Sequence, residues 1–69
     1  MTGIVKFFDP VKGLGTIVSD LGREYFFRYT SLPKLNGKFV PLHPGEKVQF
    51  DIEQDMYYGE EAVNIHKIG

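Results

Sequence analysis

The sequence lacks cysteine altogether, which excludes disulfide bonds and metal sites built from thiolates. It also lacks any apolar run close to the roughly 20 residues that a membrane-spanning helix needs. The first segment, MTGIVKFFDP, contains one lysine and no long apolar stretch, so we expect no signal peptide, no membrane partner and a cytoplasmic location. A chain of 69 residues without covalent cross-links has room for one small domain, which packing alone must stabilise.

An excess of charge of one sign is also missing, since the net charge is −1 at pH 7. This value argues against indiscriminate binding to polyanions. The charges are nevertheless unevenly distributed, because residues 1–38 contain six Lys and Arg against three Asp and Glu, whereas residues 39–69 contain two against six. Two interpretations stay open: a scatter of surface charge, or a basic face opposite an acidic back.

What the sequence does contain is a series of strand-like segments rich in β-branched and aromatic residues. None of them shows the 3.6-residue apolar repeat of a helix. Strands are expected at residues 2–8, 14–19, 23–29, 47–54 and 61–68. Five short strands predict an all-β fold, a small antiparallel barrel whose closure removes the sheet edges, with an SH3-like barrel as the competing architecture.

Alternation within these segments predicts which side chains are buried. Val48, Phe50 and Ile52 are expected inside, with Gln49 and Asp51 outside.

The same period of two places Tyr25 and Phe27 in the core. The proline-rich residues 30–46 predict a long connection, with one helical turn at residues 30–35. At least one of Tyr57 and Tyr58, which flank the last turn, is expected to pack against the barrel.

Two glycines lie close together in KGLGTI, residues 12–17. A P-loop needs a longer spacing and a following helix, so we reject nucleotide hydrolysis. Gly13 and Gly15 are interpreted instead as a tight turn and a position of close strand packing. His43 and His66 have no second ligand at metal spacing, and no nucleophile–His–acid set is visible. We therefore expect no enzyme activity, no catalytic residue, no metal and no cofactor.

The motifs resemble, in order and over essentially the whole chain, those of the bacterial cold-shock proteins. The family's GxVKWFN and KGFGFI correspond to GIVKFFD and KGLGTI, and its VFVHF corresponds to YFFRY at residues 25–29. PLHPGEKVQFDI and AVNI match the family's SLxEGQxVxFxI and AxNV. The resemblance implies one cold-shock-like domain over residues 1–69, folded as a five-stranded antiparallel OB-type β-barrel. It also implies a binder of single-stranded RNA or DNA that acts as an RNA chaperone or regulator of gene expression.

The resemblance further implies a site on the first three strands, where exposed aromatic rings stack on unpaired bases and basic side chains meet phosphates. Carried over position by position, the nucleic-acid-binding residues are Lys6, Phe7, Phe8, Lys12, Leu14, Thr16, Phe26, Arg28, Tyr29 and Phe39.

This chain departs from the family pattern within that site. Leu14 and Thr16 replace the two aromatic residues of KGFGFI, which predicts weakened or altered base stacking, at ~1–3 kcal/mol for each lost stack. Asp9 replaces Asn and adds repulsion toward phosphate. Arg28 replaces His and partly offsets that loss, because a guanidinium both stacks on bases and pairs with phosphate. The alternative is a barrel repurposed as a protein-binding module, with the partner on the face of the first three strands.

Overall fold

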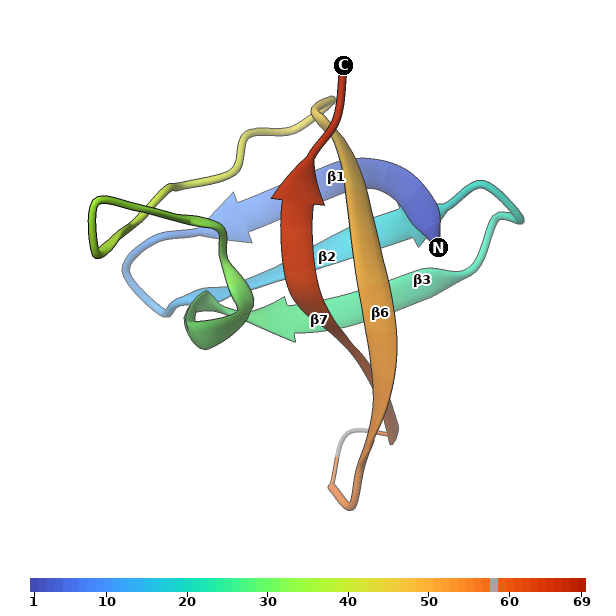
Figure 1. Ribbon diagram of the computed structural model, residues 1–69. Coiled ribbons are helices and arrows are strands. Elements are labelled where there is room, and N and C mark those ends of the chain that lie inside the picture. Colours follow the sequence, from blue (N-terminus) through green and yellow to red (C-terminus); the bar gives the residue numbers. More distant parts are fainter. Residues whose placement is uncertain (58) are drawn as a thin grey trace.

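A computed structural model describes residues 1–57 and 59–69 as a closed β-barrel (Figure 1). The barrel strands are β1 (Thr2–Asp9), β2 (Leu14–Ser19), β3 (Glu24–Arg28), β6 (Lys47–Asp55) and β7 (Gly59–Lys67). Between β3 and β6 lie a 3-10 helix, η1 (Tyr29–Ser31), and a small hairpin of β4 (Lys34–Leu35) and β5 (Lys38–Phe39). The predicted five-stranded all-β barrel is confirmed. Within the described residues, no helix is long and apolar enough to cross a membrane.

The strands follow one another around the barrel in the order β1-β2-β3-β7-β6. Neighbours pair antiparallel except β3 and β7, which run parallel where Phe26 pairs with Glu61. A closed ring with an odd number of strands cannot alternate in direction throughout, so one parallel pair is a geometric necessity. We call this closing pair the β3–β7 seam.

The core occupies the inside of the barrel, as the alternation in β6 predicts. Val48 and Phe50 are buried, whereas Gln49 and Asp51 are exposed. Ile52 packs against the core but is only partly buried, and Figure 1 shows that the β6–β7 hairpin extends beyond the barrel. The residues that form the core are Val5, Ile17, Tyr25, Phe27, Leu32, Leu42, Val48, Phe50, Ala62 and Ile65.

The long connection is more ordered than the sequence interpretation held. The helical turn expected at residues 30–35 lies instead at Tyr29–Ser31, and Lys34–Leu35 forms strand β4. Asn36 and Gly37, with φ of 53° and 78°, turn this strand back into β5. Asn-Gly favours such left-handed hairpin turns, so the signal was present in the sequence.

The prediction that at least one of Tyr57 and Tyr58 packs against the barrel is tested only for Tyr57. Tyr57 is 90% exposed, so this ring does not pack against the barrel. Tyr58 lies outside the described residues.

Candidate nucleic-acid interface

Six side chains on the outside of β1, β2 and β3 form two rows across the sheet. In one row Phe7 pairs with Thr16 and Thr16 with Phe26; in the next Asp9 pairs with Leu14 and Leu14 with Arg28. Paired residues stand on the same side of a sheet, and residues two apart in a strand share that side. We call this set the outer face: Phe7, Asp9, Leu14, Thr16, Phe26 and Arg28.

A β-bulge in β1 places Phe7 on the outer face. Val5 pairs with Ile17 and Phe7 pairs with Thr16, so Lys6 is an extra residue without a registered partner in β2. Strict alternation from buried Val5 would turn Phe7 inward, but the bulge leaves both Lys6 and Phe7 exposed. The Phe7 ring is 47% exposed and thus accessible to a base.

The same bulge turns Phe8, another predicted site residue, toward the core. Phe8 is partly buried and stacks on Phe27, with ring centroids 5.8 Å apart and an angle of 16° between the rings. Gly15 permits this packing, because a Cβ there would lie 2.5 Å from Cζ of Phe27 and 2.6 Å from the carbonyl oxygen of Phe7. The interpretation of Gly15 as a position of close packing is confirmed, and Phe8 supports the site from below.

Leu14 and Thr16 lie on β2, the central strand of the three, between the flanking Phe7 and Phe26. As predicted, both face outward while Ile17 is buried. Leu14 is 39% exposed. Thr16 is half-buried, and its hydroxyl oxygen is buried without a hydrogen-bond partner among the described residues. The two departures from the family pattern therefore fall in the middle of the outer face.

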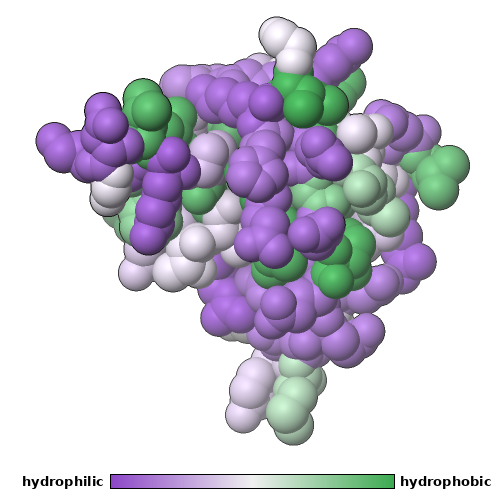
Figure 2. Space-filling model, viewed as in Figure 1, coloured by the Kyte–Doolittle hydropathy of each residue, from purple (hydrophilic) through white to green (hydrophobic). Residues whose placement is uncertain are grey.

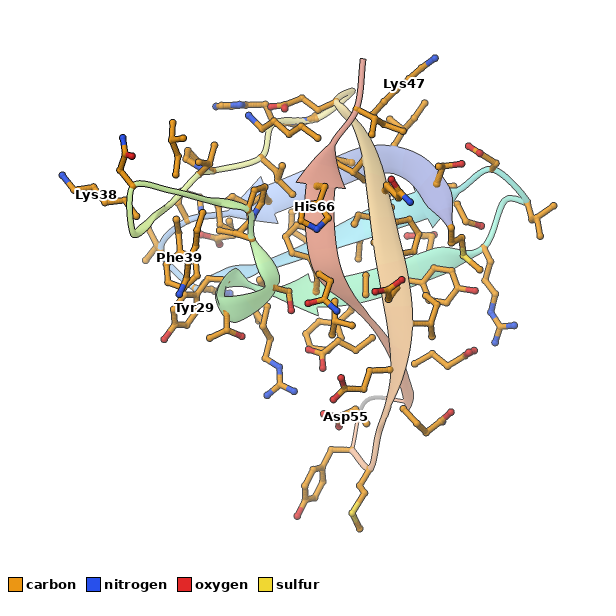
Figure 3. The ribbon with its side chains drawn as sticks, viewed as in Figure 1. Tyr29, Lys38, Phe39, Lys47, Asp55 and His66 are labelled. Carbon is orange, nitrogen blue, oxygen red and sulfur yellow. The ribbon has the colours of Figure 1, made fainter. Side chains whose placement is uncertain are left out.

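Tyr29 and Phe39 form an aromatic pair beside the outer face (Figure 3). Their rings meet edge to face, with centroids 5.6 Å apart, and they are 51% and 39% exposed. The Nζ of Lys34 lies 4.9 Å from the centroid of the Phe39 ring. Lys34 was missed by the sequence interpretation, which did not recognise the β4–β5 hairpin that pairs it with Phe39.

The loop between β1 and β2 supports this aromatic pair. Gly13 adopts a φ of +69°, and a Cβ there would lie 2.8 Å from Cδ1 of Tyr29, so the turn interpretation of Gly13 is confirmed. The Tyr29 amide donates a hydrogen bond to the Gly13 carbonyl at 2.8 Å. An open pocket lies between loop and connection, and its lining includes Val11, Lys12, Tyr29 and Phe39.

Asp9 stabilises the same loop. One oxygen of its carboxylate accepts hydrogen bonds from the backbone amides of Val11 at 2.9 Å and Lys12 at 3.2 Å. The Asp9 carbonyl accepts a third bond, from Gly13, at 2.8 Å. Asp9 thus has a structural role in addition to the repulsion toward phosphate that its charge implies.

Arg28 lies at the β3–β7 seam and is held by two carboxylates. Its Nε donates to one Glu61 oxygen at 2.6 Å, and its Nη2 donates to the other Glu61 oxygen and to Asp55, both at 2.9 Å. The guanidinium carbon lies 6.0 Å from the centre of the Phe26 ring. Arg28, predicted to meet phosphate, is therefore engaged within the protein. Glu61 and Asp55 were missed because they are distant in sequence.

The other basic residues within residues 1–38 fall into two groups, those with a carboxylate partner and those that make no salt bridge among the described residues. Lys6 bridges Glu24 at 3.1 Å with both side chains more than half exposed, and Arg23 bridges Glu60 at 2.7 Å. Exposed ion pairs of this kind are weak and exchange readily. In the described part of the chain Lys12, Lys34 and Lys38 make no salt bridge. We call the set Lys12, Tyr29, Lys34, Lys38 and Phe39 the Tyr29–Phe39 end.

The opposite side of the barrel has a different character. Figure 2 looks onto β6 and β7, and hydrophilic side chains cover much of this face. The acidic residues of these two strands are Asp51, Glu53, Asp55, Glu60 and Glu61. These five carboxylates stand against Lys47 and Lys67 on the same two strands, and the Arg23–Glu60 and Arg28–Glu61 ion pairs join this side to the two ends of β3.

Comparison with known proteins gives matches that include every strand of the barrel. A family model described as the 'Cold-shock' DNA-binding domain matches residues 1–68. The major cold shock protein of Streptococcus pyogenes serotype M18 (strain MGAS8232) is 39% identical over 66 residues, covering 96% of this chain and 94% of that protein. Cold shock-like protein CspG of Escherichia coli (strain K12) is 38% identical over 66 residues, covering 94% of this chain and 90% of that protein.

Proposed function

Because the chain belongs to the cold-shock domain family, we propose that it binds single-stranded RNA or DNA on β1–β3, with a base-stacking surface altered in its centre. The observation that carries this proposal is the row of Phe7, Thr16 and Phe26 across three paired strands. Two aromatic residues flank a gap at which this chain has no ring. The altered surface, rather than nucleic-acid binding itself, distinguishes this chain.

The binding mechanism follows from the groups that the surface presents. Exposed rings offer flat faces to unpaired bases, whereas a duplex keeps its bases stacked internally and offers only phosphates to the same surface. Phe7, Tyr29 and Phe39 supply exposed rings, and Phe26 supplies a partly buried one. Lys6, Lys12, Lys34 and Lys38 are exposed, and their ammonium groups supply the positive charge for backbone phosphates.

The distribution of these groups shifts binding toward the Tyr29–Phe39 end. Two stacks missing at Leu14 and Thr16 correspond to about 2–6 kcal/mol of lost affinity. The Tyr29–Phe39 pair and the lysines without salt bridges beside it are unaffected by that loss. A bound strand therefore contacts this end most strongly and crosses the middle of the outer face with weaker contacts.

Weak and salt-sensitive contacts of this kind suit a protein that keeps single strands unpaired and then releases them. We infer an RNA chaperone or regulator of gene expression, acting by binding rather than by catalysis, as one domain over residues 1–69 in the cytoplasm. The comparisons do not favour the alternative of a protein-binding module.

Fluorescence anisotropy with labelled oligonucleotides tests this proposal. Matched single-stranded RNA, single-stranded DNA and duplex DNA are titrated with the protein over a series of salt concentrations. We expect measurable binding to single strands, weaker binding to the duplex, and an affinity for single strands that falls as salt rises. Equal affinity for duplex and single strand, or no single-strand binding at low salt, would overturn it.

A further inference from the structure

We propose that Glu61, together with Asp55, keeps Arg28 from binding phosphate and so ends the nucleic-acid footprint at the β3–β7 seam. The inference rests on the proposed single-strand binding and assigns a specificity-determining role to residues outside the outer face. The strand of nucleic acid would then be held mainly between Phe7 and the Tyr29–Phe39 end.

The geometry favours Arg28 over phosphate as the partner of Glu61. The Glu61 side chain is only 6% exposed, and both of its oxygens accept hydrogen bonds from the Arg28 guanidinium, at 2.6 and 2.9 Å. A buried carboxylate without a cation beside it is strongly unfavourable. A phosphate that took Arg28 away would leave Glu61 in that state, so phosphate competes poorly for this guanidinium.

Asp55 adds a second constraint from the hairpin. One of its oxygens accepts a bond from Arg28 at 2.9 Å, and the other accepts the backbone amide of Tyr57 at 2.7 Å. The contact therefore joins the end of β3 to the tip of the β6–β7 hairpin. It also places a second negative charge where a phosphate would approach Arg28, which repels the nucleic-acid backbone.

Among the described residues, the lysines of the Tyr29–Phe39 end are not held by carboxylates, and the nearby Asp9 carboxylate bonds to backbone amides instead. Within residues 1–57 and 59–69, Lys12, Lys34 and Lys38 have no carboxylate partner at salt-bridge distance. A phosphate there gains an attraction without breaking an ion pair. The two margins of the surface therefore differ in whether their cations are available, and this difference positions the strand.

The salt dependence of binding measures the number of phosphates that the protein neutralises, which makes it the appropriate readout. We compare the wild-type chain with Glu61→Gln, which keeps the size and planar shape of the side chain but removes its charge and one of the two oxygens that accept from Arg28. Glu53→Gln is the matched control, because it removes the same charge from an exposed residue of the same hairpin. Thermal unfolding followed by circular dichroism verifies that each variant is folded.

We expect Glu61→Gln to release Arg28 for one phosphate contact. The plot of log affinity against log salt should then steepen by roughly 0.7 for a single strand, with tighter binding at low salt. Glu53→Gln should leave that slope at the wild-type value. An unchanged slope for folded Glu61→Gln, or an equal change in both variants, overturns the proposal while leaving single-strand binding itself intact.

A double variant isolates Arg28 and protects the test against misfolding. Arg28→Gln with Glu61→Gln replaces the ion pair by two neutral amides that can bond to each other. If Arg28 makes no phosphate contact in the wild-type protein, this double variant keeps the wild-type slope. A slope shallower by roughly 0.7 would show that Arg28 already binds phosphate and would overturn the proposal, whether or not the single variant folds. If the wild-type protein shows no single-strand binding at all, the proposed function is overturned together with this inference.

Discussion

The outer face of β1–β3 and the turn of the β6–β7 hairpin both present exposed aromatic side chains, yet only the outer face resembles a surface for bases. Tyr57 at the hairpin tip is 90% exposed, about twice the exposure of Phe7 at 47%. Tyr57 stands beside Asp55 in a hairpin rich in carboxylates, whereas Phe7 stands in a row of paired strands with Lys6 next to it. Exposure of a ring is thus insufficient. A stacking surface also needs neighbouring rings at strand spacing and cations within reach of phosphate.

The strongest test of this comparison removes rings from both regions. We expect Phe7→Ala combined with Phe26→Ala to weaken single-strand binding by about 2–6 kcal/mol, because two bases lose their stacking partners. Tyr57→Ala should leave the affinity unchanged. Anisotropy titrations of the two variants against the same labelled oligonucleotide make the measurement.

Two results would break the comparison. Wild-type affinity in the double variant would remove stacking as the mechanism. A loss in Tyr57→Ala as large as that in the double variant would show that the hairpin tip is part of the binding surface.

A gain of affinity should follow when rings are restored to the centre of the outer face. Leu14→Phe with Thr16→Phe would fill the middle of both rows, and we expect single-strand binding to strengthen tenfold or more. The change also removes the buried Thr16 hydroxyl that has no partner among the described residues, so it relieves a desolvation cost. Val18→Phe is the matched control, since it adds the same ring to the outside of β2 beyond the two rows.

Affinity in the folded Leu14 and Thr16 double variant decides this prediction. An affinity equal to that of the wild type would mean that Leu14 and Thr16 do not stand where bases stack. Equal gains from Val18→Phe would mean that any added ring on β2 improves binding, whatever its place.

The smallest expected effect concerns stability rather than binding. Burial raises the pKa of Glu46, but hydrogen bonds from Lys67 and His43 outweigh it and hold that pKa below its ordinary value of 4.5. A carboxyl group with a lowered pKa stabilises the fold fully above pH 4.5, and this contribution is lost as the pH falls through the folded-state value. Glu46→Gln should therefore reduce the free energy of unfolding by less than about 1 kcal/mol at neutral pH.

Urea unfolding of the wild type and Glu46→Gln at several pH values checks this. The difference between the two proteins should shrink toward acid pH, and single-strand affinity should be the same at neutral pH. A difference that grows toward acid pH would contradict the assignment. A change in affinity would show that the contact from the connection to β7 influences the outer face.

Local patterns predicted the parts of the fold that depend on local physics. Alternation located Val48 and Phe50 inside, and the same rule separated Tyr25 and Phe27 from their outward neighbours. Glycine chemistry identified Gly13 as a turn. Each of these signals resides in a few consecutive residues, so a single sequence is enough to recognise it.

The remaining features depend on contacts between distant segments. No sequence pattern predicts the bulge at Lys6. Because of this bulge, Phe7 faces outward and Phe8 packs on Phe27. Arg28 and Glu61 are 33 residues apart, so their pairing becomes visible only when β3 meets β7. The residues of the candidate site could therefore be named from the sequence. Which of them face outward, and which are held in ion pairs, depends on the strand register and on the closure of the barrel.

The β3–β7 seam has a consequence for the dynamics of the barrel. β1 and β2 are joined by a long antiparallel ladder, whereas Phe26 and Glu61 form the only registered pair across the seam among the described residues. Regions with few backbone hydrogen bonds open at lower free energy than the rest of a domain. Local opening should start here, so amide hydrogens along β3 on the side facing β7 should exchange with solvent before those between β1 and β2. The ion pairs of Arg28 with Glu61 and Asp55 then add side-chain contacts between β3 and the β6–β7 hairpin, where the barrel has few backbone pairs.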